Sequence, residues 1–267
     1  MAHGSTIAQA SALEAVLKRD RLIVLAGLVG VAGLAWLYLV VMATGMHMSM
    51  PTGEHVAMPQ IRPWSTVDFV LMFLMWAIMM VGMMVPSAAP MVLLYARVCR
   101  TQREKGRPFA PTGAFVAGYV AVWGAFSLVA TVLQWALEQA ALLSPMMVGT
   151  SPILGVGLLI AAGIYQLSPL KHVCLRHCRG PLDFIMRHWR KGTGGALVMG
   201  IEHGAYCVGC CWFLMGLLFV GGVMNLLWVA AIAIFVLIEK VAPHGELAAR
   251  VGGAALAGAG LVLLLAG

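Results

Sequence analysis

The stretch LIVLAGLVGVAGLAWLYLVVMA, residues 22–43, decides the fold class because it contains no charged residue. As a helix that rises about 1.5 Å per residue, it is long enough to cross a hydrocarbon core of roughly 30 Å. It exceeds the apolar region of a signal peptide, and no clear A-x-A cleavage site follows it. We therefore expect residues 22–43 to form a retained membrane-spanning helix.

Six further apolar segments follow along the chain. They are residues 67–95, 113–137, 152–167, 195–220, 224–238 and 251–266. The first of these contains Pro86 and Pro90, which predict a kinked or tilted helix. The fifth and sixth spans are separated so tightly, at residues 221–225, that they must form a hairpin. The sequence thus predicts an all-α, polytopic transmembrane bundle of about seven spans, the seventh of which could instead lie in the membrane interface.

The composition agrees with a membrane protein. Of the residues, 61% are apolar and 10% are charged, whereas a soluble domain carries about 25% charged residues. Such a chain has too little polar surface to cover a water-facing globule, so lipid must solvate it. The net charge of +7 does not indicate nucleic-acid binding, because the basic residues flank apolar segments and lie on no soluble domain.

The basic residues predict the orientation. In a seven-span arrangement all 17 Lys and Arg residues except Arg62 fall on one side, and the positive-inside rule makes that side the cytoplasm. We therefore expect a multi-pass protein of the bacterial inner (plasma) membrane with a cytoplasmic segment at 1–21. Residues 22–267 would form a single transmembrane domain with an outer loop at 44–66 and a cytoplasmic loop at 168–194.

The run GIEHGAYCVGCCW, residues 200–212, places ligating side chains inside the fifth span. Its candidate metal ligands are Glu202, His203, Cys207, Cys210 and Cys211. On a helix, His203, Cys207 and Cys210 lie within about 60° of one another, and the glutamate points elsewhere. His and Cys bind zinc and copper, and thiolate selects soft Cu(I). The alternative is that small buried cysteines lie in a glycine-rich packing seam.

The run KHVCLRHC, residues 171–178, lies on the predicted cytoplasmic side. Its candidate ligands are His172, Cys174, His177 and Cys178. Pro169 and Pro181 bracket the run and predict a short helix between two breaks. Because the cytoplasm keeps thiols reduced, metal ligation is a better interpretation than a structural disulfide, and the run could meet His203 near the inner leaflet. The alternative is a basic helix that contacts anionic lipid.

The run GMHMSMPTGEHVAMP, residues 45–59, lies in the predicted outer loop. Its candidate ligands are His47, Met48, Met50 and His55. Thioether and imidazole suit Cu(I), and thioethers remain ligands where free thiols would oxidise. Cysteines inside and Met/His outside would fit a copper path across the membrane. The alternative is an ordinary loop of a Met-rich chain.

Two features inside the spans are interpreted as structural. Met72, Met79 and Met83 share one face of the second span, and such stripes are more often adaptable packing than metal ligands. Glu239, at the end of the sixth span, is expected to pair with Lys240 or Arg250.

No catalytic or nucleotide-binding signature is present in the sequence. It lacks G-x-S-x-G, Walker A and H-E-x-x-H motifs, and no G-x-G-x-x-G precedes a cofactor domain. A bis-His haem would need two histidines at similar depth on facing spans. Only His203 lies clearly within a span, so the sequence disfavours haem.

The runs MMVPSAAPM (83–91), YQLSPLKHVCLRHC (165–178) and GAYCVGCCWFLMGLLFVGGVMNLLW (204–228) resemble an uncharacterised bacterial family of metal-binding integral membrane proteins. The resemblance extends over roughly residues 68–243. It implies a helical membrane fold and a metal site formed by the Cys and His residues of the two inner runs, and it implies no reaction.

These observations favour a non-catalytic membrane protein that binds a soft metal, with copper preferred and zinc as the alternative. Its role would be sequestration, export, or delivery to a membrane cuproenzyme. Two other classes stay open. One is a membrane thiol-disulfide oxidoreductase, and the other is an auxiliary helical subunit of a larger membrane complex.

Overall fold

The computed structural model describes residues 3–48, 64–104, 111–143 and 151–266, with side chains described from residue 21 onward except at 46–48. Their helices are α1 (His3–Met48), α2 (Thr66–Glu104), α3 (Thr112–Gln139), α4 (Pro152–Leu167), α5 (Pro169–Arg179), α6 (Pro181–His188), α7 (Gly192–Gly216), α8 (Leu218–Gly221), α9 (Leu226–Val241) and α10 (Gly245–Ala266). This part of the chain contains no β-strand. The all-α class is confirmed.

Helices occupy all seven apolar segments, but they differ in their capacity to cross a membrane. Five are long and apolar enough, namely α1 from Arg21 onward, α2, α3, α7 with α8, and α10. Helices α4 and α5, which meet at a bend of 64°, would make a sixth if they act as one broken span. Helix α9 has 16 residues, about 24 Å of rise, which is shorter than a typical hydrocarbon core.

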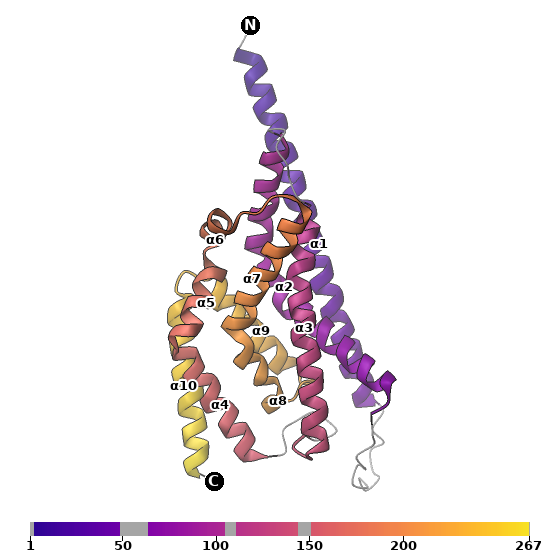
Figure 1. Ribbon diagram of the computed structural model, residues 1–267, viewed down its shortest axis with the longest axis vertical. Coiled ribbons are helices and arrows are strands. Elements are labelled where there is room, and N and C mark those ends of the chain that lie inside the picture. The colour runs from indigo at the N-terminus through magenta and orange to yellow at the C-terminus, as the bar shows by residue number, and fades with distance from the viewer. Residues whose placement is uncertain (1–2, 49–63, 105–110, 144–150, 267) are drawn as a thin grey trace.

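Successive long helices run in opposite directions (Figure 1). Helices α1, α3, α7 and α10 run downward in this view, whereas α2, α4 and α9 run upward. Helix α5 packs on α7 and on α9. Helix α5 therefore links the Cys/His-rich helix α7 to α9.

The segment at 168–194 is largely helical rather than an irregular loop. Ser168 ends α4 and caps α5, where its side-chain oxygen accepts a hydrogen bond from the backbone N–H of Lys171 at 3.2 Å. Pro169 at the first position of α5 has no N–H to lose, which suits a helix start. The predicted short helix between Pro169 and Pro181 is confirmed, and Pro181 begins α6.

Helix α2 continues through Pro86 and Pro90 without a break. A proline at position 86 leaves the carbonyl of Gly82 without its usual donor. The indole N–H of Trp36 on α1 supplies that hydrogen bond at 3.2 Å. This hydrogen bond links α1 to α2. It also satisfies the backbone carbonyl that the proline leaves unpaired, as is necessary inside a membrane.

Helices α3 and α7 approach closely because glycines lie at their crossing. A Cβ atom at Gly118 would collide with the backbone carbonyl of Leu197, and one at Gly200 would collide with that of Phe115. Gly204, one turn further along α7, meets Val122 of α3. This small-residue spacing permits backbone contact between helices, and it fixes the height of the cysteines that follow on α7.

Candidate metal centre

Four thiols from two helices meet beside the α3–α7 crossing. Cys207, Cys210 and Cys211 lie on α7 with exposures of 1%, 0% and 0%. Cys178 extends from α5, packs against the core that contains these cysteines, and lies within interaction range of the sulfurs of Cys207 and Cys210. We call Cys178, Cys207, Cys210 and Cys211 the thiol cluster. The predicted convergence of the two inner runs is therefore present for Cys178, and the cysteines of the described residues form no disulfide.

The other cysteine of the α5 run lies at the edge of the thiol cluster. The Cys174 sulfur packs against Gly209 of α7, where an added Cβ would lie 2.9 Å from it. Cys174 is half-buried. It lies one helical turn from Cys178 on the same face of α5, so it could accept an ion from the cluster without being part of it.

The Cys207 sulfur has two further polar neighbours. The Lys240 ammonium on α9 donates to it at 2.8 Å, and the Tyr119 hydroxyl on α3 lies 3.0 Å away. Lys240 also donates to the hydroxyl of Ser87 on α2 at 3.2 Å. Cys207 is thus the point at which α2, α3, α5, α7 and α9 are joined by polar contacts. The sequence did not predict that Tyr119, Ser87 and Lys240 lie here. Tyr119 and Ser87 belong to no recognisable motif, and Lys240 was noticeable only as a charge next to a long apolar run.

His203 lies one turn before Cys207 and is 2% exposed. Its ring is surrounded by Phe115, Tyr119 and Phe184, with centroid separations of 6.0, 5.8 and 5.4 Å. Its Nδ1 atom has no hydrogen-bond partner among the described residues. A buried nitrogen without a partner is uncommon, and an imidazole nitrogen on the thiol-bearing face of α7 is available as a ligand.

The remaining predicted ligands of this region lie elsewhere. Glu202 accepts hydrogen bonds from Arg190 at 2.6 Å and pairs with His188 at 3.1 Å, so it joins α7 to the end of α6. His177 stacks on Tyr206 with a centroid separation of 4.1 Å. These contacts do not bring Glu202 or His177 to the thiols.

His172 is occupied at both ring nitrogens. Nδ1 contacts the carbonyl of Ser168 at 2.8 Å, and Nε2 lies 3.5 Å from Arg250. In the outer run, His47 and Met48 end α1, and their side chains lie outside the description. Met50 and His55 lie outside the described residues.

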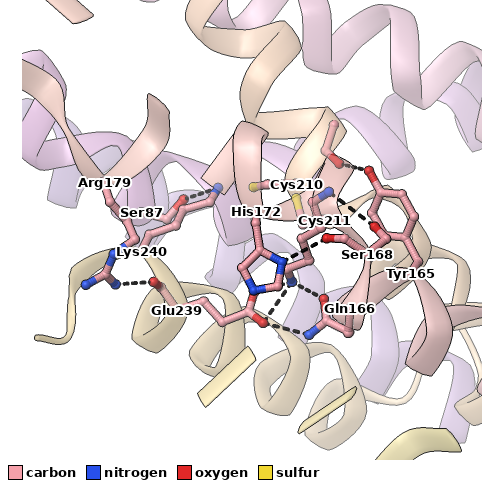
Figure 2. Close-up of polar contacts among 12 residues, drawn as sticks. Ser87, Tyr165, Gln166, Ser168, His172, Arg179, Cys210, Cys211, Glu239 and Lys240 are labelled. Atoms are coloured by element: carbon pink, nitrogen blue, oxygen red, sulfur yellow. Dashed lines mark hydrogen bonds and ion pairs between the residues drawn. The ribbon is translucent and has the colours of Figure 1, made fainter. Parts of the chain in front are cut away.

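The buried charge next to the thiol cluster pairs differently from our expectation. Glu239 binds Lys171 of α5 through both carboxylate oxygens at 2.8 Å, and Gln166 also donates to it at 2.6 Å. The predicted ion pair of Glu239 with Lys240 or Arg250 is therefore wrong, because the α4–α5 bend carries Lys171 into the bundle. Figure 2 shows Glu239 directed toward Gln166, whereas Lys240, its neighbour on α9, reaches Ser87.

The thiols are close, but they do not surround a common point. Within the described ranges, no three His, Cys, Asp or Glu side chains are arranged to hold a metal ion. Cys210 and Cys211 both donate to the carbonyl of Cys207, at 3.1 and 3.0 Å. Rotation of these two side chains about their Cα–Cβ bonds would be needed to turn their sulfurs toward an ion.

Comparison with known proteins adds a family. Residues 73–263 match the PpoB2 family, described as copper chaperone. The chain belongs to this family. No curated protein matches the chain, and no solved structure matches it. The resemblance to a metal-related family is confirmed.

The copper-chaperone match includes every member of the thiol cluster, together with His203 and Lys240. The Met/His-rich run at 45–59 precedes the matched residues. The buried methionines of α2, including Met79 and Met83, lie in the same apolar core as Cys207. A chaperone for copper needs soft ligands, and the described residues gather them at this point of the bundle.

Proposed function

We propose that the protein is an integral membrane copper chaperone whose cargo is Cu(I), held by Cys207 and Cys210 with Cys178. His203 and Cys211 are the nearest additional ligands, and Cys174 is a transfer position. The contact of Cys178 with two thiols of another helix supports this proposal, since one helix cannot surround an ion alone. Thiolates select Cu(I) over harder divalent ions.

The membrane placement is part of the proposal. The five long apolar helices and the bent α4–α5 pair are candidate spans. We propose that α9 crosses as a short seventh span. The alternating helix directions in Figure 1 support this topology, in which the basic segments would face the cytoplasm of a bacterial inner membrane. A periplasm-dependent reporter enzyme fused after α10 is expected to be active, and an inactive fusion would contradict the seven-span topology.

In this topology three members of the thiol cluster would lie inside the bundle, in the half of α7 that is farther from its cytoplasmic start. Copper would then be delivered to a membrane cuproenzyme or exported.

Copper analysis of the full-length protein in mild detergent tests the proposal. The Cys207→Ser/Cys210→Ser double variant is expected to retain little of the copper held by wild type after anaerobic loading with Cu(I) and dialysis. Cys99→Ser is the matched control, since Cys99 is buried on α2 but packs in a separate apolar cluster. Equal copper in wild type and the double variant would end the proposal.

The same samples distinguish a thiol-disulfide oxidoreductase. In that case mild oxidation would convert Cys178 and one of its two thiol partners to a disulfide in the absence of copper. Thiol counts that stay equal before and after mild oxidation would favour the chaperone.

A further inference from the structure

Lys240 is a buried cation without a carboxylate partner in the described part of the chain. Its residue is 7% exposed. The one carboxylate near it in sequence, Glu239, is engaged by Lys171 and Gln166. The recorded partners of the Lys240 ammonium are the sulfur of Cys207 and the hydroxyl of Ser87.

A lone ammonium in an apolar interior is strongly unfavourable unless an anion compensates it. Ser87 is neutral, so the compensating group must be sulfur. A thiolate has several lone pairs, and it can accept a hydrogen bond from Lys240 on one side while it binds an ion on another. Lys240 therefore does not need to leave when Cys207 becomes a ligand.

From this geometry we infer that Lys240 determines the charge of the metal ion that the thiol cluster accepts, favouring monovalent Cu(I) over divalent Zn(II). The inference rests on the proposed function. Repulsion between a fixed positive charge and a metal ion is proportional to the charge of the ion, so a divalent ion is penalised twice as much as a monovalent one. The low-dielectric surroundings strengthen this difference.

The net charge of the occupied site also favours Cu(I) over Zn(II). Two thiolates, from Cys207 and Cys210, with Cys178 as a neutral thiol, the Lys240 ammonium and Cu(I) sum to zero net charge. Zn(II) in place of Cu(I) leaves one uncompensated positive charge inside the bundle, which is costly. Without the lysine, the neutral combination becomes Zn(II) with two thiolates. Lys240 is thus a positioning residue that acts on the ion through Cys207.

The test is the ratio of Cu(I) to Zn(II) affinities, measured by competition with chelators on the full-length protein in detergent. Both ions bind the same thiolates, so the cost of thiol deprotonation cancels in the ratio. Lys240→Met is expected to lower the ratio by about tenfold or more. Lys240→Arg, which keeps the charge, should retain the wild-type ratio. Lys191→Met, at an exposed lysine before α7, should leave it unchanged.

The outcomes separate the two proposals. If wild type binds copper and Lys240→Met has an unchanged ratio, the role of Lys240 is overturned and the copper site stands. If wild type binds no copper, both are overturned. If Lys240→Met does not fold, Lys240→Gln and Lys240→Arg are compared in its place. A lower ratio in the glutamine variant alone supports the inference, and equal ratios in both contradict it.

Discussion

Glu239 on α9 and Lys171 on α5 form an ion pair with contacts of 2.8 Å and no exposed side-chain surface on either residue. The pair ties the short α9 to the helix that carries Cys178. Lys171 also donates to Gln166, and Arg179 donates to the carbonyl of Glu239. The position of Cys178 relative to α7 is therefore set by contacts that lie outside the thiol cluster.

Removal of one partner of this pair should destabilise the protein strongly. Glu239→Ala leaves the Lys171 ammonium buried and unpaired, and we expect a loss of about 3–5 kcal/mol in the free energy of unfolding. Glu246→Ala is the control, since its contact with Arg176 is 3.9 Å long and exposed; it should change stability by less than about 1 kcal/mol. Denaturant unfolding in detergent measures both, and similar losses would contradict the role given to the buried pair.

The glycines at the α3–α7 crossing should not tolerate a methyl group. Gly118→Ala would push α3 away from the backbone of α7 at Leu197, and we expect a lower unfolding temperature and less bound copper. Gly124→Ala on the same helix meets nothing within 4 Å and should be neutral or slightly stabilising, because alanine favours helix more than glycine does. A neutral Gly118→Ala variant would show that the helices cross with more space than the structure indicates.

Glu202 should not be a copper ligand. Its carboxylate is held by His188 and Arg190, so Glu202→Gln is expected to keep the copper content of wild type. It should weaken the link between α6 and α7, which proteolysis within residues 180–191 would report as faster cleavage. A loss of copper without such a change in cleavage would return Glu202 to the ligand set.

Thiol reactivity should differ between the two helices. Cys207, Cys210 and Cys211 are almost fully buried, whereas Cys174 and Cys178 are half-buried. We expect a water-soluble maleimide to label Cys178 faster than Cys207 in single-cysteine variants, which mass spectrometry can measure. In the wild-type chain, Cu(I) should protect Cys178 from labelling. Labelling of Cys178 that copper does not slow would exclude it as a ligand.

Much of the fold follows from local sequence. Uninterrupted apolar runs located all the long helices, because each helix must satisfy its own backbone in lipid. Pro169 and Pro181 predicted the limits of α5, because proline favours a helix start and cannot continue a helix. The 100° spacing of α7 likewise grouped Cys207, Cys210 and His203. The span count depends on α9, which is apolar but has only 16 residues.

The contacts between side chains of different helices could not be predicted from local sequence. Cys178 reaches Cys207 only because the α4–α5 bend directs α5 back onto α7. Lys240 and Glu239 are adjacent in sequence, yet they serve different networks, because successive residues of a helix point about 100° apart. The hydropathy of a helix does not indicate which other helices pack against it. The choice between Lys171 and Arg250 as partner of Glu239 therefore depended on tertiary packing.

The hydrogen bond from Trp36 to the carbonyl of Gly82 has a consequence for biogenesis. Helix α2 alone would expose that carbonyl to acyl chains during insertion, which is unfavourable where no water is present. Helix α1 is synthesised first, so its indole is already available when α2 leaves the translocon. If α1 and α2 insert together as a hairpin, the carbonyl of Gly82 is never exposed to lipid without a hydrogen-bond donor. Trp36→Phe should therefore slow insertion but leave the thiol cluster of the mature protein unchanged.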